Sequence, residues 1–210
     1  MTPRSTPGST IKRQRLGVFG GAFDPPHVAH VALAKVAIHQ LELDGLWVIP
    51  TGQAWHKTRA LSPAVHRLKM AALAFAFEPR IVIDDRETRR AGPTYTIETL
   101  RELQAENPRA DLFLIVGADQ ARSLNQWHQW EDVVKSATIC VAGREHSASA
   151  DGEFVPPPAL KGRFAGLMMP FNPVSATAIR TRVAQSEPVA ALVGESVARY
   201  IAQHHLYLQS

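Results

Sequence analysis

The chain has 210 residues, of which 45% are hydrophobic and 20% are charged, which is ordinary for a soluble globular protein with an apolar core. It contains no apolar run near the roughly 20 residues that span a bilayer and no signal-peptide-like apolar stretch at its N-terminus. A single cysteine, Cys140, excludes an intrachain disulfide and a cysteine-based zinc cluster. These features favour a cytoplasmic protein.

The net charge of +4 comes from the first 15 residues. Four basic residues and no acidic one lie there: Arg4, Lys12, Arg13 and Arg15. The other 19 basic residues balance 19 acidic ones, so the remainder carries no net charge, which argues against nucleic-acid binding. We expect residues 1–15, rich in Ser, Thr, Pro and Gly, to form a flexible basic leader, and residues 16–210 to form a single domain.

Short apolar runs alternate with helical patterns along the rest of the chain. Strands are expected at residues 16–19, 46–49, 81–84, 112–116, 138–141 and 163–168, and helices at 28–43, 64–76, 94–105, from Ser175 onward and at 195–204. Because the strand segments are continuously apolar, they predict a parallel sheet covered on both faces. The expected fold class is α/β, a Rossmann-like doubly wound parallel sheet with helices on both faces and a small helical C-terminal part. The polar segment 143–162 contains three consecutive prolines and is expected to be a long surface loop.

Candidate chemistry appears where the first predicted strand ends. Gly20 and Gly21 lack side chains, which lets a phosphate or sugar approach the backbone. His27 and His30 follow a Pro-Pro pair and share one face of the next helix, in its first turn. The unpaired amides and the dipole of a helix N-terminus favour an anion. The segment therefore predicts a receptor for a polyphosphate.

Other interpretations of this segment are weaker. The glycine spacing matches neither the G-x-G-x-x-G fingerprint nor a P-loop. A metal site at His27 and His30 would need a further ligand at a suitable spacing, and none is nearby. The two histidines could also be incidental surface residues.

A second candidate phosphate element lies about 145 residues downstream, at residues 173–180 (PVSATAIR). Ser175 is a good N-cap for a helix. Thr177 and Arg180 are three residues apart, so a hydroxyl and a guanidinium face one direction near the helix start. The alternative is a capped surface helix with a solvated Arg180.

These two segments resemble the motifs of the nucleotidylyltransferase α/β-phosphodiesterase superfamily. Residues 20–30 (GGAFDPPHVAH) resemble its G-G-x-F-D-P-x-H and H-x-G-H motifs, and residues 173–180 resemble its I-S-S-T-x-I-R motif. Ala29 and Ala176 stand where the family usually has Gly and Ser, so we expect tighter nucleotide packing and one phosphate contact fewer. The resemblance implies catalysis by His27, His30 and Arg180 and ATP binding by Gly20, Gly21, Phe23, Ser175 and Thr177.

The middle and the end of the chain resemble bacterial nicotinate-nucleotide adenylyltransferases. The matching segments are residues 92–100 (GPTYTIETL), 112–119 (LFLIVGAD) and 197–207 (VARYIAQHHLY). The resemblance implies that a helix start at Thr94, Tyr95 and Thr96 binds the nicotinate carboxylate. It also implies that Trp127 stacks on the pyridine ring. Alternatively, Trp127 and Trp130 belong to a core stripe.

Further nucleotide contacts are implied by the same resemblance. Gly117 and Asp119 would lie at the ATP site, with Asp119 holding a ribose hydroxyl or positioning magnesium. His56 and Lys57, in the loop after the second strand, are candidates for phosphate contacts, although a solvated lysine is an equal alternative.

The implied reaction is adenylyl transfer from ATP to nicotinate mononucleotide, which gives deamido-NAD and pyrophosphate. Mg²⁺ would bind through the ATP phosphates, without metal ligands from the protein, and no nucleic-acid or membrane partner is expected. Alternatives are an enzyme with pantetheine phosphate or nicotinamide mononucleotide as acceptor, or a non-catalytic nucleotide-binding or RNA-binding module. The signatures around Tyr95 and Trp127 argue against pantetheine phosphate.

Overall fold

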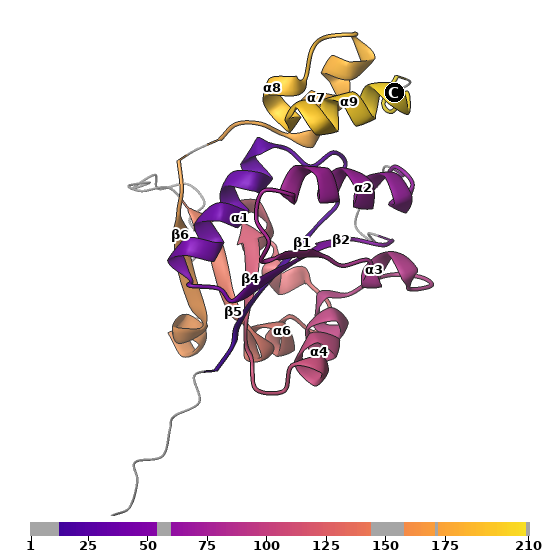
Figure 1. The fold of residues 1–210 in the computed structure, drawn as a ribbon. Coiled ribbons are helices and arrows are strands. Elements are labelled where there is room, and N and C mark those ends of the chain that lie inside the picture. The colour runs from indigo at the N-terminus through magenta and orange to yellow at the C-terminus, as the bar shows by residue number, and fades with distance from the viewer. Residues whose placement is uncertain (1–12, 54–59, 144–157, 171, 209–210) are drawn as a thin grey trace, which may run out of the picture.

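The computed structural model describes residues 13–53, 60–143, 158–170 and 172–208, and its centre is a six-stranded parallel sheet (Figure 1). The strands are β1 (Arg15–Gly21), β2 (Gly45–Pro50), β3 (Ile81–Ile83), β4 (Asp111–Gly117), β5 (Thr138–Gly143) and β6 (Phe164–Met168). Their order is β3-β2-β1-β4-β5-β6, and every pairing is parallel. Because β1 pairs with both β2 and β4, the winding of the chain reverses beside β1. This confirms the predicted doubly wound α/β fold.

Helices cover the sheet and add a C-terminal part. They are α1 (Val28–Gln40), α2 (Ala64–Phe75), α3 (Arg86–Arg89), α4 (Thr96–Glu106), α5 (Ala118–Arg122), α6 (Trp130–Ser136), α7 (Ala176–Ala184), α8 (Ala190–Val193) and α9 (Glu195–Gln203), with 3₁₀ helices η1 (Leu124–Gln126) and η2 (Pro158–Arg163). The helix predicted at 28–43 ends at Gln40, and the helix predicted at 94–105 begins at Thr96. Helices α3, α5, α6 and α8 were not predicted, because seven residues or fewer show no clear helical period.

The ends of two predicted segments are clarified by the structure. Residues 1–12 of the predicted leader lie outside the described residues, and β1 already begins at Arg15. Most of the predicted loop 143–162 also lies outside them, and its described end forms η2. Pro158 stands at the start of η2, where its missing N–H costs no hydrogen bond.

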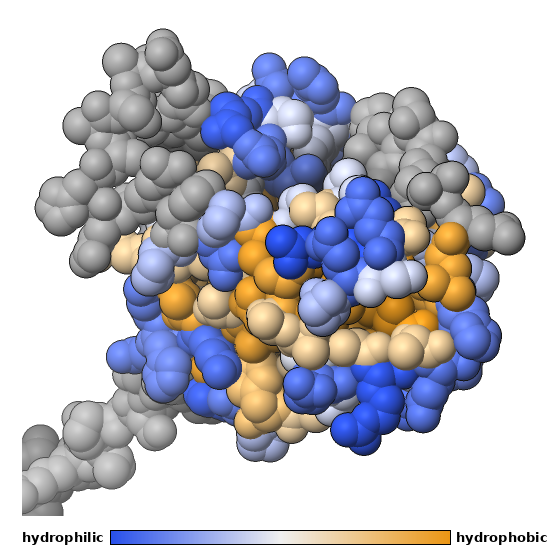
Figure 2. Space-filling view, turned by 90° about the horizontal axis from the view of Figure 1, so that it is seen from above, coloured by the Kyte–Doolittle hydropathy of each residue, from blue (hydrophilic) through white to orange (hydrophobic). Residues whose placement is uncertain are grey.

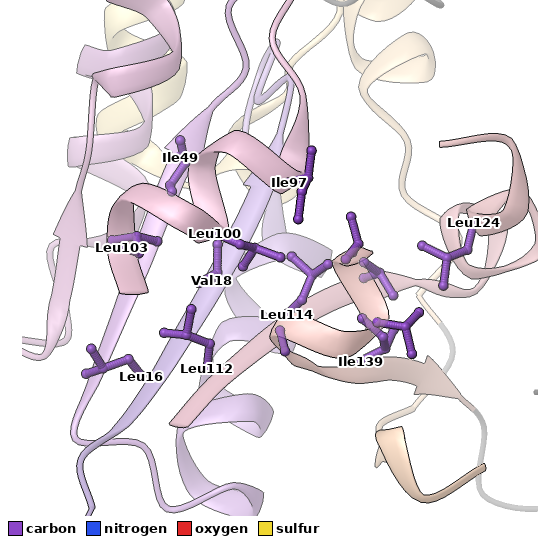
Figure 3. Close-up of a cluster of buried hydrophobic side chains, with 14 of the residues drawn as sticks. Leu16, Val18, Ile49, Ile97, Leu100, Leu103, Leu112, Leu114, Leu124 and Ile139 are labelled. Atoms are coloured by element: carbon purple, nitrogen blue, oxygen red, sulfur yellow. The ribbon is translucent and has the colours of Figure 1, made fainter. Parts of the chain in front are cut away.

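Two apolar clusters lie on the two faces of the sheet. Along β4, Leu112 and Leu114 face a cluster with α4 and α6, whereas Phe113 and Ile115 face a cluster with α1 and α2. Figure 3 shows the first cluster, where Leu100 of α4 lies over the strands. A strand buried on both sides explains why the β4 segment is continuously apolar.

The C-terminal helices pack on α2 through a third cluster. Met70 of α2 is fully buried there against Ile179, Val197 and Ile201. Figure 1 places α7, α8 and α9 above α1 and α2, and Figure 2, a view onto this end, shows apolar side chains between hydrophilic ones. Among the described residues, no helix is long and apolar enough to cross a membrane.

Candidate active site

The loop between β1 and α1 carries the first predicted motif. Phe23 adopts a left-handed backbone conformation with φ 47° and is almost fully buried. Its ring packs edge-on against Phe19 and Phe75, at centroid distances of 5.4 and 5.9 Å. Phe23 therefore anchors the loop in the core, which leaves the nucleotide contact predicted for it untested.

The paired glycines serve different purposes. A Cβ added to Gly21 would lie 3.2 Å from the ring of Phe23, so the absent side chain makes room for the anchor. A Cβ added to Gly20 would meet nothing within 4 Å. Gly20 is exposed at the end of β1, so it is the glycine of the pair beside open space for a ligand.

His27 and His30 meet at the N-terminus of α1. His27 is the N-cap, and the two rings stack with centroids 3.8 Å apart. The His27 backbone N–H donates to His30 Nδ1 at 3.2 Å. Because Nδ1 accepts this hydrogen bond, a neutral His30 ring carries its proton on Nε2. His30 therefore presents an N–H donor from Nε2.

His27 lies deeper than His30 and is 7% exposed. Burial lowers the pKa of His27 to about 4, so the ring is neutral near pH 7. Its Nδ1 is buried and has no hydrogen-bond partner within the part of the chain that the structure describes. The negative charge of a bound triphosphate would favour the protonated ring.

Arg180 joins the second predicted motif to the first. The Ser175 hydroxyl accepts from the Ala178 amide at 3.2 Å and so caps α7 as predicted. Arg180 donates from one nitrogen to the Thr177 hydroxyl at 3.0 Å and from another to the Asp24 carbonyl at 2.9 Å. The structure therefore brings Arg180 to the loop that leads into His27.

The predicted acceptor helix begins later than expected. Helix α4 starts at Thr96 with Tyr95 as its N-cap, and the ring of Tyr95 lies 4.3 Å from that of His128. Thr94 is buried, and its amide donates to the Gln53 carbonyl at 3.4 Å. The amides of Thr96 and Ile97, the first two of α4, have no helical carbonyl before them to bond and are thus better placed for an anion than the amide of Thr94.

Trp127 and Trp130 are both half-buried and pack against the cluster beneath α4 and α6. This contact agrees with the alternative that the two form a core stripe. A half-buried indole still exposes part of its ring, so stacking on a flat acceptor stays a prediction.

The remaining predicted nucleotide contacts follow β4 and β2. Gly117 ends β4, and a Cβ added there would meet nothing within 4 Å. Asp119 is exposed in α5 and forms an ion pair with Arg122. His56 and Lys57 lie outside the described residues.

Glu87 is a buried residue of the site region that sequence reasoning missed. Its carboxylate accepts from the Thr51 hydroxyl at 3.0 Å and from the Thr99 hydroxyl at 2.7 Å. It ties the end of β2 to α4, and a Cβ on Gly52 would lie 2.1 Å from the Glu87 carbonyl. Glu87 stands in a run of charged residues, which gives no sequence signal of burial.

Arg67 is a second buried charge that the sequence did not reveal. It is 3% exposed, and its guanidinium donates to the carbonyls of Ala22, Thr51 and Ser62 at 3.1, 2.7 and 2.9 Å. Burial lowers the pKa of Arg67, and the nearby Asp24 opposes this shift. Arg67 thereby holds the loops that follow β1 and β2 together.

Comparisons with known proteins show the family of the chain. Residues 18–182 match the cytidylyltransferase-like family, and the chain belongs to that family. Its relatives include a probable nicotinate-nucleotide adenylyltransferase of Albidiferax ferrireducens, 57% identical over 92% of this chain and 98% of the relative, and one of Methylibium petroleiphilum, 42% identical over 93% of each. The resemblance inferred from the sequence is confirmed.

Solved structures share the fold. Nicotinic acid mononucleotide adenylyltransferase of Plasmodium falciparum complexed with NaAD has a TM-score of 0.73 and 17% identity, covering 94% of this chain and 98% of its own. The same enzyme complexed with APC has a TM-score of 0.74 and 16% identity over the same shares. At such identities the likeness shows the fold.

Acidification from pH 6.5 to pH 4 should lower the free energy of unfolding through His27. The pKa of His27 is about 4 in the fold and 6.5 in the unfolded chain, so only the unfolded chain takes up this proton in that window. The free energy of unfolding is unaffected by this difference above pH 6.5. Its loss grows as the pH falls toward 4 and amounts to about 3 kcal/mol at most. Urea denaturation from pH 4 to 7 should show a flatter dependence for His27→Gln, whereas the exposed His128→Gln keeps the wild-type slope. Equal slopes in all three would contradict the role of burial.

Glu87→Ala should lower the free energy of unfolding by about 2–4 kcal/mol, because the buried hydroxyl of Thr99 and the half-buried hydroxyl of Thr51 lose their acceptor. The matched control is Glu98→Ala on α4, whose exposed carboxylate lies 3.9 Å from Arg90 and whose loss should cost less than about 1 kcal/mol. Urea denaturation measures both, and a similar small cost for the two variants would refute the role of Glu87.

Proposed function

We propose that this chain transfers the adenylyl group of ATP to nicotinate mononucleotide, giving deamido-NAD and pyrophosphate. The observation that carries the proposal is the hydrogen bond from Arg180 to Asp24, which unites a guanidinium with the two stacked histidines at the end of β1. The names of the relatives support the acceptor.

The reaction is an in-line attack by the acceptor phosphate on the α-phosphorus of ATP. The acceptor phosphate is already ionised near neutral pH, so no strong general base is needed. Catalysis then consists of positioning and of stabilising the charge that develops on the departing pyrophosphate. The Nε2–H of His30 and the fork of Arg180 are donors suited to that charge. No covalent intermediate is expected.

Mg²⁺ is proposed to enter with the ATP phosphates. The described ranges contain no group of three or more His, Cys, Asp or Glu side chains placed to hold a metal ion. The phosphates would supply its ligands, and the exposed Asp119 just past β4 could orient its water or a ribose hydroxyl. When bound, the ion neutralises phosphate charge.

The acceptor is proposed to bind between the start of α4 and Trp127. The amides near Thr96 favour a carboxylate, which nicotinate has and nicotinamide lacks. The half-exposed Trp127 offers a face for the pyridine ring. We further propose a cytoplasmic location, in keeping with a single free cysteine, Cys140, whose burial raises its thiol pKa to about 12.

Pyrophosphate release from ATP and Mg²⁺ tests this function, with nicotinate mononucleotide, nicotinamide mononucleotide and pantetheine phosphate offered in parallel. We expect kcat/KM to be greatest with nicotinate mononucleotide, by roughly tenfold or more over the nicotinamide form. Chelating Mg²⁺ should abolish release. Release with pantetheine phosphate alone would change the acceptor, and ATP binding without release from any acceptor would favour a binding protein.

His30→Ala should lower kcat by about 10²-fold or more, because His30 is proposed to act on charge that develops in the transition state. The KM for nicotinate mononucleotide should change little, since His30 does not belong to the acceptor elements. His39→Ala, an exposed histidine in the last turn of the same helix, is the control. Unchanged turnover in His30→Ala would remove His30 from the mechanism.

A further inference from the structure

We propose that Tyr207 and Asp24 form a positioning pair that fixes Arg180 against the loop of the catalytic histidines. The inference rests on the proposed function, because it concerns how that site is assembled. Neither residue is proposed to touch the reacting atoms. Both act through Arg180.

Asp24 is the point where three distant segments meet. It is 2% exposed. One carboxylate oxygen accepts from the Tyr207 hydroxyl at 2.7 Å, and the other accepts from the Ser62 amide at 3.1 Å. Its carbonyl accepts from Arg180 at 2.9 Å. A buried carboxylate is tolerated only when it is hydrogen-bonded, so this residue depends on all of these segments staying in place.

Tyr207 lies beyond the end of α9 and reaches back into the molecule. Its backbone has φ 65°, a left-handed conformation that is uncommon for an aromatic residue and persists only where the surroundings hold it. Burial and the nearby Asp24 carboxylate raise the pKa of Tyr207, so the hydroxyl keeps its proton and donates. The hydroxyl also lies 3.9 Å from Met70 Sδ, beside the cluster under α7 and α9.

The loop between β1 and α1, which contains Asp24, is held from its other side by Arg67. The guanidinium donates to the Ala22 carbonyl, two residues before Asp24, and also to the Ser62 carbonyl. Its positive charge offsets the buried negative charge of Asp24. The loop is thus fixed on the α2 side without help from Tyr207.

The contribution of the Tyr207 hydroxyl can therefore be separated from that of apolar packing. The C-terminal helices pack on α2 through Met70, Ile179 and Ile201, and removing a hydroxyl leaves these contacts intact. The hydroxyl fixes the position of the C-terminal helices, which carry Arg180, relative to Asp24. Since an error of about 1 Å in a positioned group can cost on the order of 10² in rate, the register matters for transfer.

Tyr207→Phe tests the pair. We expect kcat to fall about tenfold and the KM for nicotinate mononucleotide to stay within about twofold, because α4 and Trp127 are untouched. Tyr200→Phe is the matched control, since its hydroxyl bonds His66 Nδ1 at 3.0 Å between α2 and α9. The control should keep the wild-type kcat.

A double variant separates positioning from general stability. If Tyr207 acts through Arg180, Tyr207→Phe should have no further effect on kcat in an Arg180→Ala background. The proposal would be overturned if Tyr207→Phe had an equal effect on kcat in both backgrounds, or if it were as active as Tyr200→Phe. It would also be overturned if the KM values of both substrates rose in parallel while Tm fell.

Calorimetric titration with MgATP distinguishes a failure of this inference from a failure of the proposed function. Tyr207→Phe should bind MgATP roughly three- to tenfold more weakly than wild type, and Tyr200→Phe should bind it equally well. This result can be read even if no tested acceptor reacts. Equal MgATP affinity in all three proteins would overturn the positioning role. If Tyr207→Phe binds MgATP more weakly as expected but no protein turns over, the result counts only against the proposed acceptor.

Discussion

The pairing of β1 with β2 on one side and β4 on the other is the constraint on which the site depends. Because all pairings are parallel, the strands end at one edge of the sheet. The chain leaves β1 toward α1 on one face and leaves β4 toward α5 at the point where the winding reverses. Ligands of doubly wound sheets bind at such a reversal, where loops diverge. The two histidines and the first turn of α1 occupy this position for that reason.

The sheet alone does not complete the site, because Arg180 comes from a helical unit that is added after the last strand. That unit packs on α2 through apolar side chains, which are not directional and so do not define a unique register. Hydrogen bonds to Asp24 provide the direction, since each needs a donor within a narrow range of distance and angle. The proposed phosphate side of the site thus combines non-specific burial with a few directional contacts.

Sequence reasoning found the parts of the fold that local pattern determines. The continuous apolar run of β4 and the capping Ser175 predicted a strand and a helix start close to those observed. Glu87 and Arg67 were missed, because a charged side chain is buried only when partners distant in sequence satisfy it, and Thr51 and Ala22 are such partners. The roles of the site residues depend on a bound ligand, which local pattern does not supply.

Thr51, just past the end of β2, connects the two halves of the site. Its amide donates to the Gly21 carbonyl at 2.8 Å, its hydroxyl donates to Glu87, and its carbonyl accepts from Arg67. The Glu87 contacts organise the start of α4, where the acceptor is proposed to bind, and the Arg67 contacts organise the loop between β1 and α1, where the phosphates of ATP are proposed to bind. Because Thr51 is bonded to both sets, a shift at the start of α4 would also disturb the loop between β1 and α1. The proposed in-line transfer between two bound substrates requires this fixed relation.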